Sequence, residues 1–280
     1  MKALIIGGTS GFGREVLSQF LDRDYDIITI SRSASNYTNY QHYTCDVGNI
    51  KDLRNVLRKI ISQNSSLDAL VCIAGFARAK PSAKLTPSDW EETLTKNLIY
   101  VGVAFQELKD LLNRSSSPRV LTIGSQWSYK TGSDELVPYS IAKQALRTLT
   151  RDFAEREPKI KANHYCVPTM DTPGYWEVRK TFKKIAKERT ITNFTPKGLA
   201  QPKIIAKSLI DKFLKTKASG STFIISKDGK IRKLWCQSFP ALKFMPSLLA
   251  PFSRTTPCGL SLRSGTPNRR GCLIIQKQLT

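Results

Sequence analysis

Residues 4–16, "LIIGGTSGFGREV", decide how the chain begins to fold. The apolar start predicts a buried strand, and "REVLSQFLDRD" (14–24) has the apolar spacing of a helix. The glycines between them permit a sharp turn and a close approach of the backbone to a ligand. Because backbone amides at a helix N-terminus bind phosphate groups, we predict a phosphate-binding loop here. The predicted loop residues are Gly7, Thr9, Ser10, Gly11, Phe12 and Gly13.

Apolar runs and helical spacings alternate along the chain up to about residue 230. The runs lack a period of two, which is typical of parallel strands covered on both faces. This order predicts one α/β domain over residues 1–230, a doubly wound parallel sheet (Rossmann fold). Further strands are predicted at 26–33, 42–47, 67–75, 119–125, 160–168 and, as the last strand, 221–226. Further helices are predicted at 50–63, 88–112, 140–157 and 201–215.

The character of the chain changes after this domain. Residues 231–280 hold eight basic residues and no acidic one, and five prolines interrupt any long helix. We predict a basic, Pro-rich C-terminal extension that is partly disordered beyond about residue 253. Two interpretations stay open: the extension covers an apolar edge or a subunit contact, or it makes a weak contact with an anionic membrane surface.

Composition excludes several classes of protein. The net charge is +22, but no basic run alternates with aromatic residues as in a single-strand nucleic-acid groove, so we do not expect nucleic-acid binding. No apolar run reaches the ~18 residues of a membrane span, and the N-terminus lacks a signal-peptide pattern. We therefore expect a cytoplasmic protein. The six cysteines form no CxxC pair, which favours free thiols over a metal site.

The end of the second predicted strand indicates which dinucleotide binds. An acidic residue at this position binds the ribose 2′-hydroxyl of NAD. Here Ser31 stands in that place, and Arg32 and Ser33 follow. A guanidinium can hold a 2′-phosphate through two parallel hydrogen bonds, whereas a carboxylate would repel it. We predict NADP(H) as the cofactor in preference to NAD.

Residues 121–146, "LTIGSQWSYKTGSDELVPYSIAKQAL", place a serine, a tyrosine and a lysine near one another. Ser125 ends a predicted strand at the sheet edge where ligands bind in α/β folds. Tyr139 and Lys143 are four residues apart on a predicted helix and share one face. A nearby ammonium favours the phenolate, so we expect Lys143 to lower the tyrosine pKa from roughly 10. The three residues predict an acid–base site.

Over residues 1–228 the chain resembles the short-chain dehydrogenase/reductase family. The glycine loop appears as "IGGTSGFG", and the family's YxxxK motif appears as "YSIAK". Two motifs depart from the pattern: "CIAG" (72–75) lacks both asparagines of NNAG, and Thr169 replaces the glycine after Pro168. The matching positions outside the loop are Asp46, Val47, Ala74, Gly75, Asn97, Ser125, Tyr139, Lys143, Pro168 and Thr172.

The resemblance implies an NADP(H)-dependent oxidoreductase acting on a small carbonyl or alcohol, with Tyr139 as general acid or base. It implies that Ser125 positions the substrate oxygen, that Lys143 binds the nicotinamide ribose, and that Asn97 holds a water of a proton relay. Asp46 and Val47 would contact adenine, while Ala74, Gly75, Pro168 and Thr172 would lie along the cofactor, with Thr172 at its carboxamide. Family members usually form homodimers or homotetramers through the helices that carry Asn97 and Tyr139.

Two other functions remain to be tested. One is a catalytically silent nucleotide sensor or scaffold on the same fold, although such proteins typically lose the tyrosine or the lysine. The other is a membrane-peripheral protein recruited by the basic extension. A nucleotide-sugar epimerase fits poorly, because that branch prefers a GxxGxxG loop and a longer substrate domain. Residues 169–198 would cover the substrate, and their Tyr175 and Trp176 suggest an apolar wall.

Overall fold

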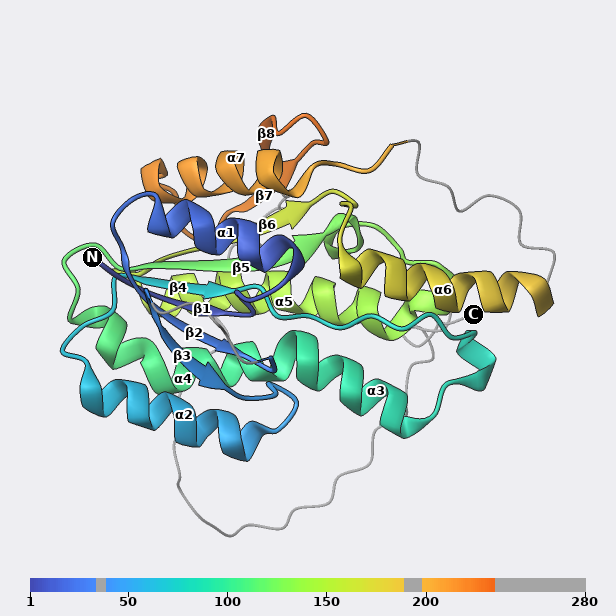
Figure 1. The fold of residues 1–280 in the computed structure, drawn as a ribbon, viewed down its shortest axis with the longest axis horizontal. Coiled ribbons are helices and arrows are strands. Elements are labelled where there is room, and N and C mark those ends of the chain that lie inside the picture. The colour runs from blue at the N-terminus through green and yellow to red at the C-terminus, as the bar shows by residue number, and fades with distance from the viewer. Residues whose placement is uncertain (34–38, 189–197, 235–280) are drawn as a thin grey trace, which may run out of the picture. The chain divides into compact units, whose positions relative to one another are not determined.

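The computed structural model describes residues 1–33, 39–188 and 198–234. These residues form one eight-stranded sheet in the order β3-β2-β1-β4-β5-β6-β7-β8 (Figure 1). The first seven strands are parallel, and β8 pairs with β7 in the antiparallel direction. The strands are β1 Lys2–Ile6, β2 Asp26–Ser31, β3 Gln41–Thr44, β4 Ala69–Cys72, β5 Arg119–Ser125, β6 Lys161–Val167, β7 Thr222–Ile225 and β8 Ile231–Leu234.

Helices cover both faces of the sheet, as the uninterrupted apolar strands predict. Successive side chains of β1 point to opposite faces: Leu4 and Ile6 pack with α2, α4 and α5, whereas Ala3 and Ile5 pack with α1 and α7. The two layers are visible on either side of the sheet in Figure 1. The helices are α1 Gly11–Leu21, α2 Ile50–Gln63, α3 Pro87–Leu94, α4 Tyr100–Asn113, α5 Val137–Arg156, α6 Pro173–Glu188 and α7 Pro202–Lys215.

The strand order places a ligand crevice. Strand β1 lies between β2 and β4, so the chain leaves the carboxyl end of β1 toward one face and that of β4 toward the other. In open α/β sheets, loops that diverge in this way leave a crevice at the carboxyl edge. The doubly wound α/β fold predicted from the sequence is therefore confirmed.

Two predictions about the elements are wrong. The strand at residues 222–225 is not the last one, because β8 continues the sheet past the predicted domain boundary at residue 230. The sequence assigned residues 231–234 to the basic extension because this edge strand carries two charged residues, Arg232 and Lys233, both of them exposed. The predicted helix at 88–112 is also not uniform, since Thr95–Ile99 form a π-helical turn between α3 and α4.

Other predictions fall outside what the structure describes. Residues 235–280 lie beyond the described ranges. The predicted partial disorder of the extension and its predicted membrane contact both concern these residues. Among the described residues, no helix is long and apolar enough to cross a membrane. Homo-oligomer formation and cytoplasmic location stay predictions. The helices expected to pair carry Ile99 and Ile141, each 45% exposed.

Candidate active site

A cavity of about 430 Å³ opens at the carboxyl edge of the sheet. It extends from the glycine loop and the end of β2 to the first turns of α6. Every residue predicted for the site lines this cavity except Asn97, which is fully buried beside it. The predicted lining residues are Gly7, Thr9, Ser10, Gly11, Phe12, Gly13, Ser31, Arg32, Ser33, Asp46, Val47, Ala74, Gly75, Ser125, Tyr139, Lys143, Pro168 and Thr172.

The glycine loop is packed too closely for side chains at two of its positions. Gly7 has a φ of +101°, and a β-carbon there would lie 2.5 Å from the backbone nitrogen of Ala74. A β-carbon on Gly13 would lie 1.9 Å from the carbonyl oxygen of Gly7. These contacts draw the N-terminus of α1 against β1 and turn its first amides toward the cavity, where they can bind an anion.

The end of β2 is tied to the same loop. Thr9 Oγ1 donates a hydrogen bond to Ser31 Oγ at 2.8 Å, and Ser31 Oγ donates to the carbonyl oxygen of Ser33 at 3.0 Å. Arg32 is exposed at the rim and has no hydrogen-bond or ion-pair partner among the residues that the structure describes. Its guanidinium is therefore available to an anionic ligand.

The carboxylate of Asp46 is held beside the cavity by a hydrogen bond from a backbone amide and by an ion pair. Its Oδ1 accepts a hydrogen bond from the Gly48 amide at 2.8 Å, and its Oδ2 lies 3.7 Å from Lys96 Nζ. The ammonium of Lys96 also pairs with Glu92 at 3.0 Å and lies 5.3 Å from the centroid of the Phe76 ring. The sequence singled out Asp46, but Lys96 and Phe76 were missed because they belong to no motif.

The loop after β4 is held by side chains from the helix that follows it. Asn97 Nδ2 donates to the carbonyl oxygens of Phe76 at 2.7 Å and Thr93 at 2.8 Å, and Asn97 Oδ1 accepts from the Phe76 amide at 3.2 Å. The hydroxyl of Tyr100 donates to the Ala74 carbonyl at 2.8 Å. Asn97 lies in the π-helical turn, a distortion frequent at functional sites. The water that it was expected to hold stays a prediction.

Ser125, Tyr139 and Lys143 converge on the cavity wall. Ser125 Oγ accepts a hydrogen bond from the Trp127 amide at 3.1 Å, so its own hydrogen can point into the cavity. Lys143 is 3% exposed, its Nζ donates to the Ile123 carbonyl at 3.0 Å, and it lies 5.6 Å from the centroid of the Tyr139 ring.

The expected lowering of the tyrosine pKa is wrong for this structure. Burial raises the pKa of Tyr139 to about 12, against the opposite effect of a hydrogen bond with Ser125. Burial also lowers the pKa of Lys143 to about 8, because a charged ammonium loses its hydration in the interior. Desolvation therefore outweighs the hydrogen bond with Ser125, and Tyr139 is a protonated phenol at neutral pH.

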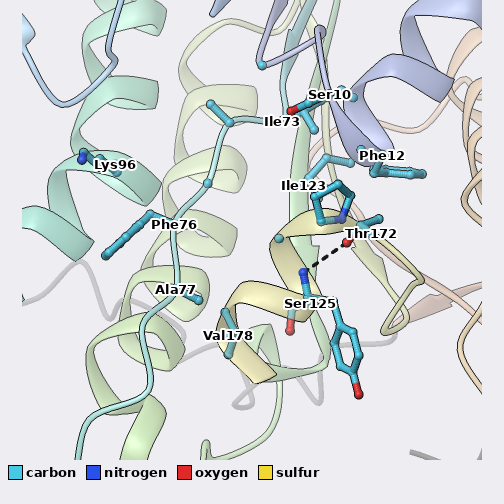
Figure 2. A pocket seen from close by; sticks show the side chains of 18 of the residues that line it. Ser10, Phe12, Ile73, Phe76, Ala77, Lys96, Ile123, Ser125, Thr172 and Val178 are labelled. Atoms are coloured by element: carbon cyan, nitrogen blue, oxygen red, sulfur yellow. Dashed lines mark hydrogen bonds between the residues drawn. The ribbon is translucent and has the colours of Figure 1, made fainter. Parts of the chain in front are cut away.

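The far end of the cavity is mostly apolar. Figure 2 shows Phe76 and Ala77 on the segment after β4, Val178 of α6 near Ala77, and Thr172 just before the same helix. Thr172 Oγ1 accepts a hydrogen bond from the Tyr175 amide at 3.3 Å and so caps the start of α6. Trp176 does not line the cavity, since its Nε1 donates to Asp171 at 2.7 Å and the residue is 47% exposed. Lining residues absent from the sequence motifs include Gln126, Leu136, Val178 and Phe182.

Comparison with known proteins agrees with this geometry. The sequence profile described as short chain dehydrogenase matches residues 1–183. The chain belongs to the short-chain dehydrogenase family. The mouse protein "Dehydrogenase/reductase SDR family member 11" is 22% identical over 199 residues, which are 65% of this chain and 75% of that protein. Carbonyl reductase family member 4 of Xenopus tropicalis is 22% identical over 219 residues, which are 74% of this chain and 88% of that protein.

Solved structures of short-chain dehydrogenases share the fold. The crystal structure of actinorhodin polyketide ketoreductase with NADPH superposes with a TM-score of 0.70 at 21% identity, over 81% of this chain and 95% of that chain. As a member of the short-chain dehydrogenase family, the protein is an NAD(P)-dependent oxidoreductase.

The residues present fit such a cofactor. The glycine loop leaves backbone space that side chains would fill, and the N-terminus of α1 supplies amides for a pyrophosphate. Asp46 and Val47 line the cavity on the β3 side, and Lys143 lies deeper, beside Tyr139. A nucleotide lying along this cavity would thus reach from Arg32 toward Ser125, Tyr139 and Lys143.

Replacing Gly13 by alanine should abolish cofactor binding, because the new methyl group would lie 1.9 Å from the Gly7 carbonyl oxygen. We expect NADPH affinity to fall by about 100-fold or more, with a loss of stability of about 1–3 kcal/mol from overpacking. Nicotinamide fluorescence and urea unfolding measure the two effects. Gly102→Ala in α4 is the matched control, since its β-carbon would meet only Leu149 of α5, at 3.8 Å. Equal NADPH binding by Gly13→Ala and wild type would contradict this account of the loop.

Proposed function

We propose that the protein is an NADP(H)-dependent oxidoreductase that interconverts a carbonyl compound and the corresponding alcohol, with Tyr139 as the acid–base group. One observation carries the proposal: Ser125, Tyr139 and Lys143 lie on the wall of the cavity that also contains the glycine loop. The retention of all three residues argues against a silent sensor on the same fold. The apolar far end, with Phe76, Val178 and Phe182, favours a substrate with an apolar body.

The bound nicotinamide would supply or accept the hydride; the chain's residues would manage the oxygen and its proton. In reduction, the protonated Tyr139 hydroxyl donates its proton to the carbonyl oxygen. The Ser125 hydroxyl donates a hydrogen bond to the same oxygen and stabilises the charge that develops there. Lys143, whose Nζ is anchored by its hydrogen bond to the Ile123 carbonyl, would bind and orient the nicotinamide ribose. In the oxidation direction, Tyr139 must first lose its proton.

The preference for NADP(H) is supported by Ser31 and Arg32 at the end of β2. Ser31 is bonded to Thr9 and presents no negative charge, while Arg32 lies exposed at the rim. A 2′-phosphate placed there would meet a cation and no carboxylate from β2. The net benefit should be that of a charge-assisted hydrogen bond, about 1.5–3 kcal/mol.

Arg32→Ala should weaken NADPH binding by about 10–100-fold and leave NADH binding within about twofold. The reason is that only NADPH carries the 2′-phosphate. Fluorescence titration of both cofactors measures the two affinities. Arg114→Ala, an exposed arginine at the C-terminal end of α4, is the control and should change neither. Parallel weakening of NADPH and NADH by Arg32→Ala would show that the guanidinium does not read the 2′-phosphate.

Tyr139→Phe should lower kcat for reduction of a carbonyl substrate by about 10²–10⁴-fold, the range that a positioned general acid supplies. NADPH affinity should stay within about threefold, because the ring is kept. A panel of aromatic and aliphatic ketones, followed by NADPH absorbance, measures turnover. Tyr129→Phe, outside the cavity lining, is the matched control. If wild type bound NADPH but Tyr139→Phe retained full turnover, another proton donor would have to be found.

The raised pKa of Tyr139 predicts opposite pH dependences for the two directions. The group is protonated below about pH 12, so reduction needs no titration of it at neutral pH. Oxidation needs the phenolate, and its rate should rise by about tenfold per pH unit between roughly pH 7 and 9. NADP affinity measured over the same range separates this effect from titration of Lys143, whose pKa is about 8. An oxidation rate already constant at neutral pH would mean that cofactor binding lowers the tyrosine pKa.

A further inference from the structure

A buried histidine contacts the turn that follows Ser125, on the side away from the cavity. His164 lies in β6, is 1% exposed and does not line the cavity. Its Nδ1 is 2.8 Å from Thr122 Oγ1 in β5, and its Nε2 is 3.0 Å from Ser128 Oγ in the 3-10 turn Gln126–Ser128. Both ring nitrogens are therefore hydrogen-bonded, and both partners are hydroxyl groups.

The hydrogen bonds continue from both sides of the ring. On one side, Thr122 Oγ1 lies 2.8 Å from Thr150 Oγ1, and Thr150 Oγ1 lies 2.7 Å from the carbonyl oxygen of Leu146. On the other side, Ser128 Oγ accepts the backbone N–H of Ser125 at 3.1 Å. One chain of hydrogen bonds thus connects helix α5 to the backbone of the proposed catalytic serine.

The Leu146 carbonyl and the neutral ring of His164 determine which group donates and which accepts in each of these hydrogen bonds. A carbonyl oxygen can only accept, so Thr150 donates to Leu146 and must accept from Thr122. Because the Thr122 hydroxyl donates its only hydrogen to Thr150, it must accept from His164, and Nδ1 therefore carries the proton. Burial lowers the pKa of His164 to about 3, so the ring is neutral and Nε2 is an acceptor for the Ser128 hydroxyl. The nearby cations Lys143 and Arg147 act in the same direction.

Gly124 supplies the space for this arrangement. A β-carbon at Gly124 would lie 2.1 Å from His164 Nε2 and 2.6 Å from Ser128 Oγ. No side chain fits at this position while the imidazole and the hydroxyl occupy it. The absence of a side chain at Gly124 therefore leaves the space that the His164 imidazole occupies.

We propose that His164 is a positioning residue, held as the Nδ1–H tautomer, that fixes the Ser125 turn through Ser128. Its importance for turnover rests on the function proposed above, whereas its effect on the turn does not. With Ser128 oriented by the ring, the Ser125 amide is bound and Ser125 Oγ is held by the Trp127 amide at 3.1 Å. The Ser125 hydroxyl hydrogen is then left to the substrate oxygen.

The tautomer can be measured directly, because the chain contains only two histidines. Selective ¹⁵N-histidine labelling gives two sets of ring signals, which His42→Gln assigns. We expect His164 to show a protonated Nδ1 and a bare Nε2 without change from about pH 5 to about pH 9. A protonated Nε2, or an imidazolium in this range, would overturn the proposal without any reference to enzyme activity.

Two threonines offer a matched pair of variants. Thr122 bonds Nδ1 of His164 at 2.8 Å, and Thr29 in β2 bonds Nδ1 of His42 at 2.7 Å; both are fully buried. Thr122→Val should speed hydrogen exchange of the Ser125 amide by about tenfold, whereas Thr29→Val should leave it unchanged. Ser128→Ala removes only the hydroxyl that binds the Ser125 amide. It should speed exchange of that amide at least as much as Thr122→Val does. Unchanged exchange in both Thr122→Val and Ser128→Ala would overturn the positioning role.

Turnover then separates this proposal from the proposed function. With the ketone that wild type reduces best, Thr122→Val should lower kcat by about tenfold while KM for NADPH stays within about twofold. Absence of turnover in wild type would refute the proposed function, and the tautomer and exchange results would still decide the role of His164. A loss of NADPH affinity in Thr122→Val equal to the loss in kcat would instead indicate general disruption and contradict a specific effect on Ser125.

Discussion

The close approach of Gly13 to Gly7 is the constraint on which the site depends. There is room for a hydrogen atom but not for a methyl group between the start of α1 and the loop leaving β1, since a β-carbon would lie 1.9 Å from the Gly7 carbonyl oxygen. This packing sets the direction of α1 and brings its amides to the carboxyl edge of the sheet. The loop after β4 then closes against Gly7 at Ala74. Both walls of the nucleotide end of the cavity follow from this contact.

Behind the cavity, buried polar side chains hold the loops that line it. Asn97 and Tyr100 bind the backbone of the loop after β4, and His164 binds the serine turn through Ser128. Each such bond adds only about 1 kcal/mol to stability, but leaving one buried group unpaired would cost about 1–3 kcal/mol. Loops held in this way keep the side chains of the proposed active site in position before a substrate binds.

The amino-acid sequence by itself determined the order of the elements, the doubly wound sheet and about half of the residues that line the cavity. Local patterns suffice for this, because strand and helix periodicities and the turn glycines act over a few residues. Asp46 and Ser125 could be placed at the same sheet edge since parallel strands end there together. Tyr139 could be placed near Ser125 because it lies at the start of the helix that follows the strand of Ser125. The prediction of the helix at 50–63 is confirmed to the residue.

Only the tertiary structure decided the features that depend on contacts between distant segments. Strand β8 exists because β7 offers an edge, although β8 has only four residues and two of them, Arg232 and Lys233, are charged. The pKa of Tyr139 is raised rather than lowered because burial, which no local pattern shows, outweighs the hydrogen bond with Ser125. The bond between His164 in β6 and Ser128 after β5 joins residues 36 positions apart. Spacing along the chain carries no information on such contacts or on desolvation, because both are set by which surfaces the completed fold removes from water.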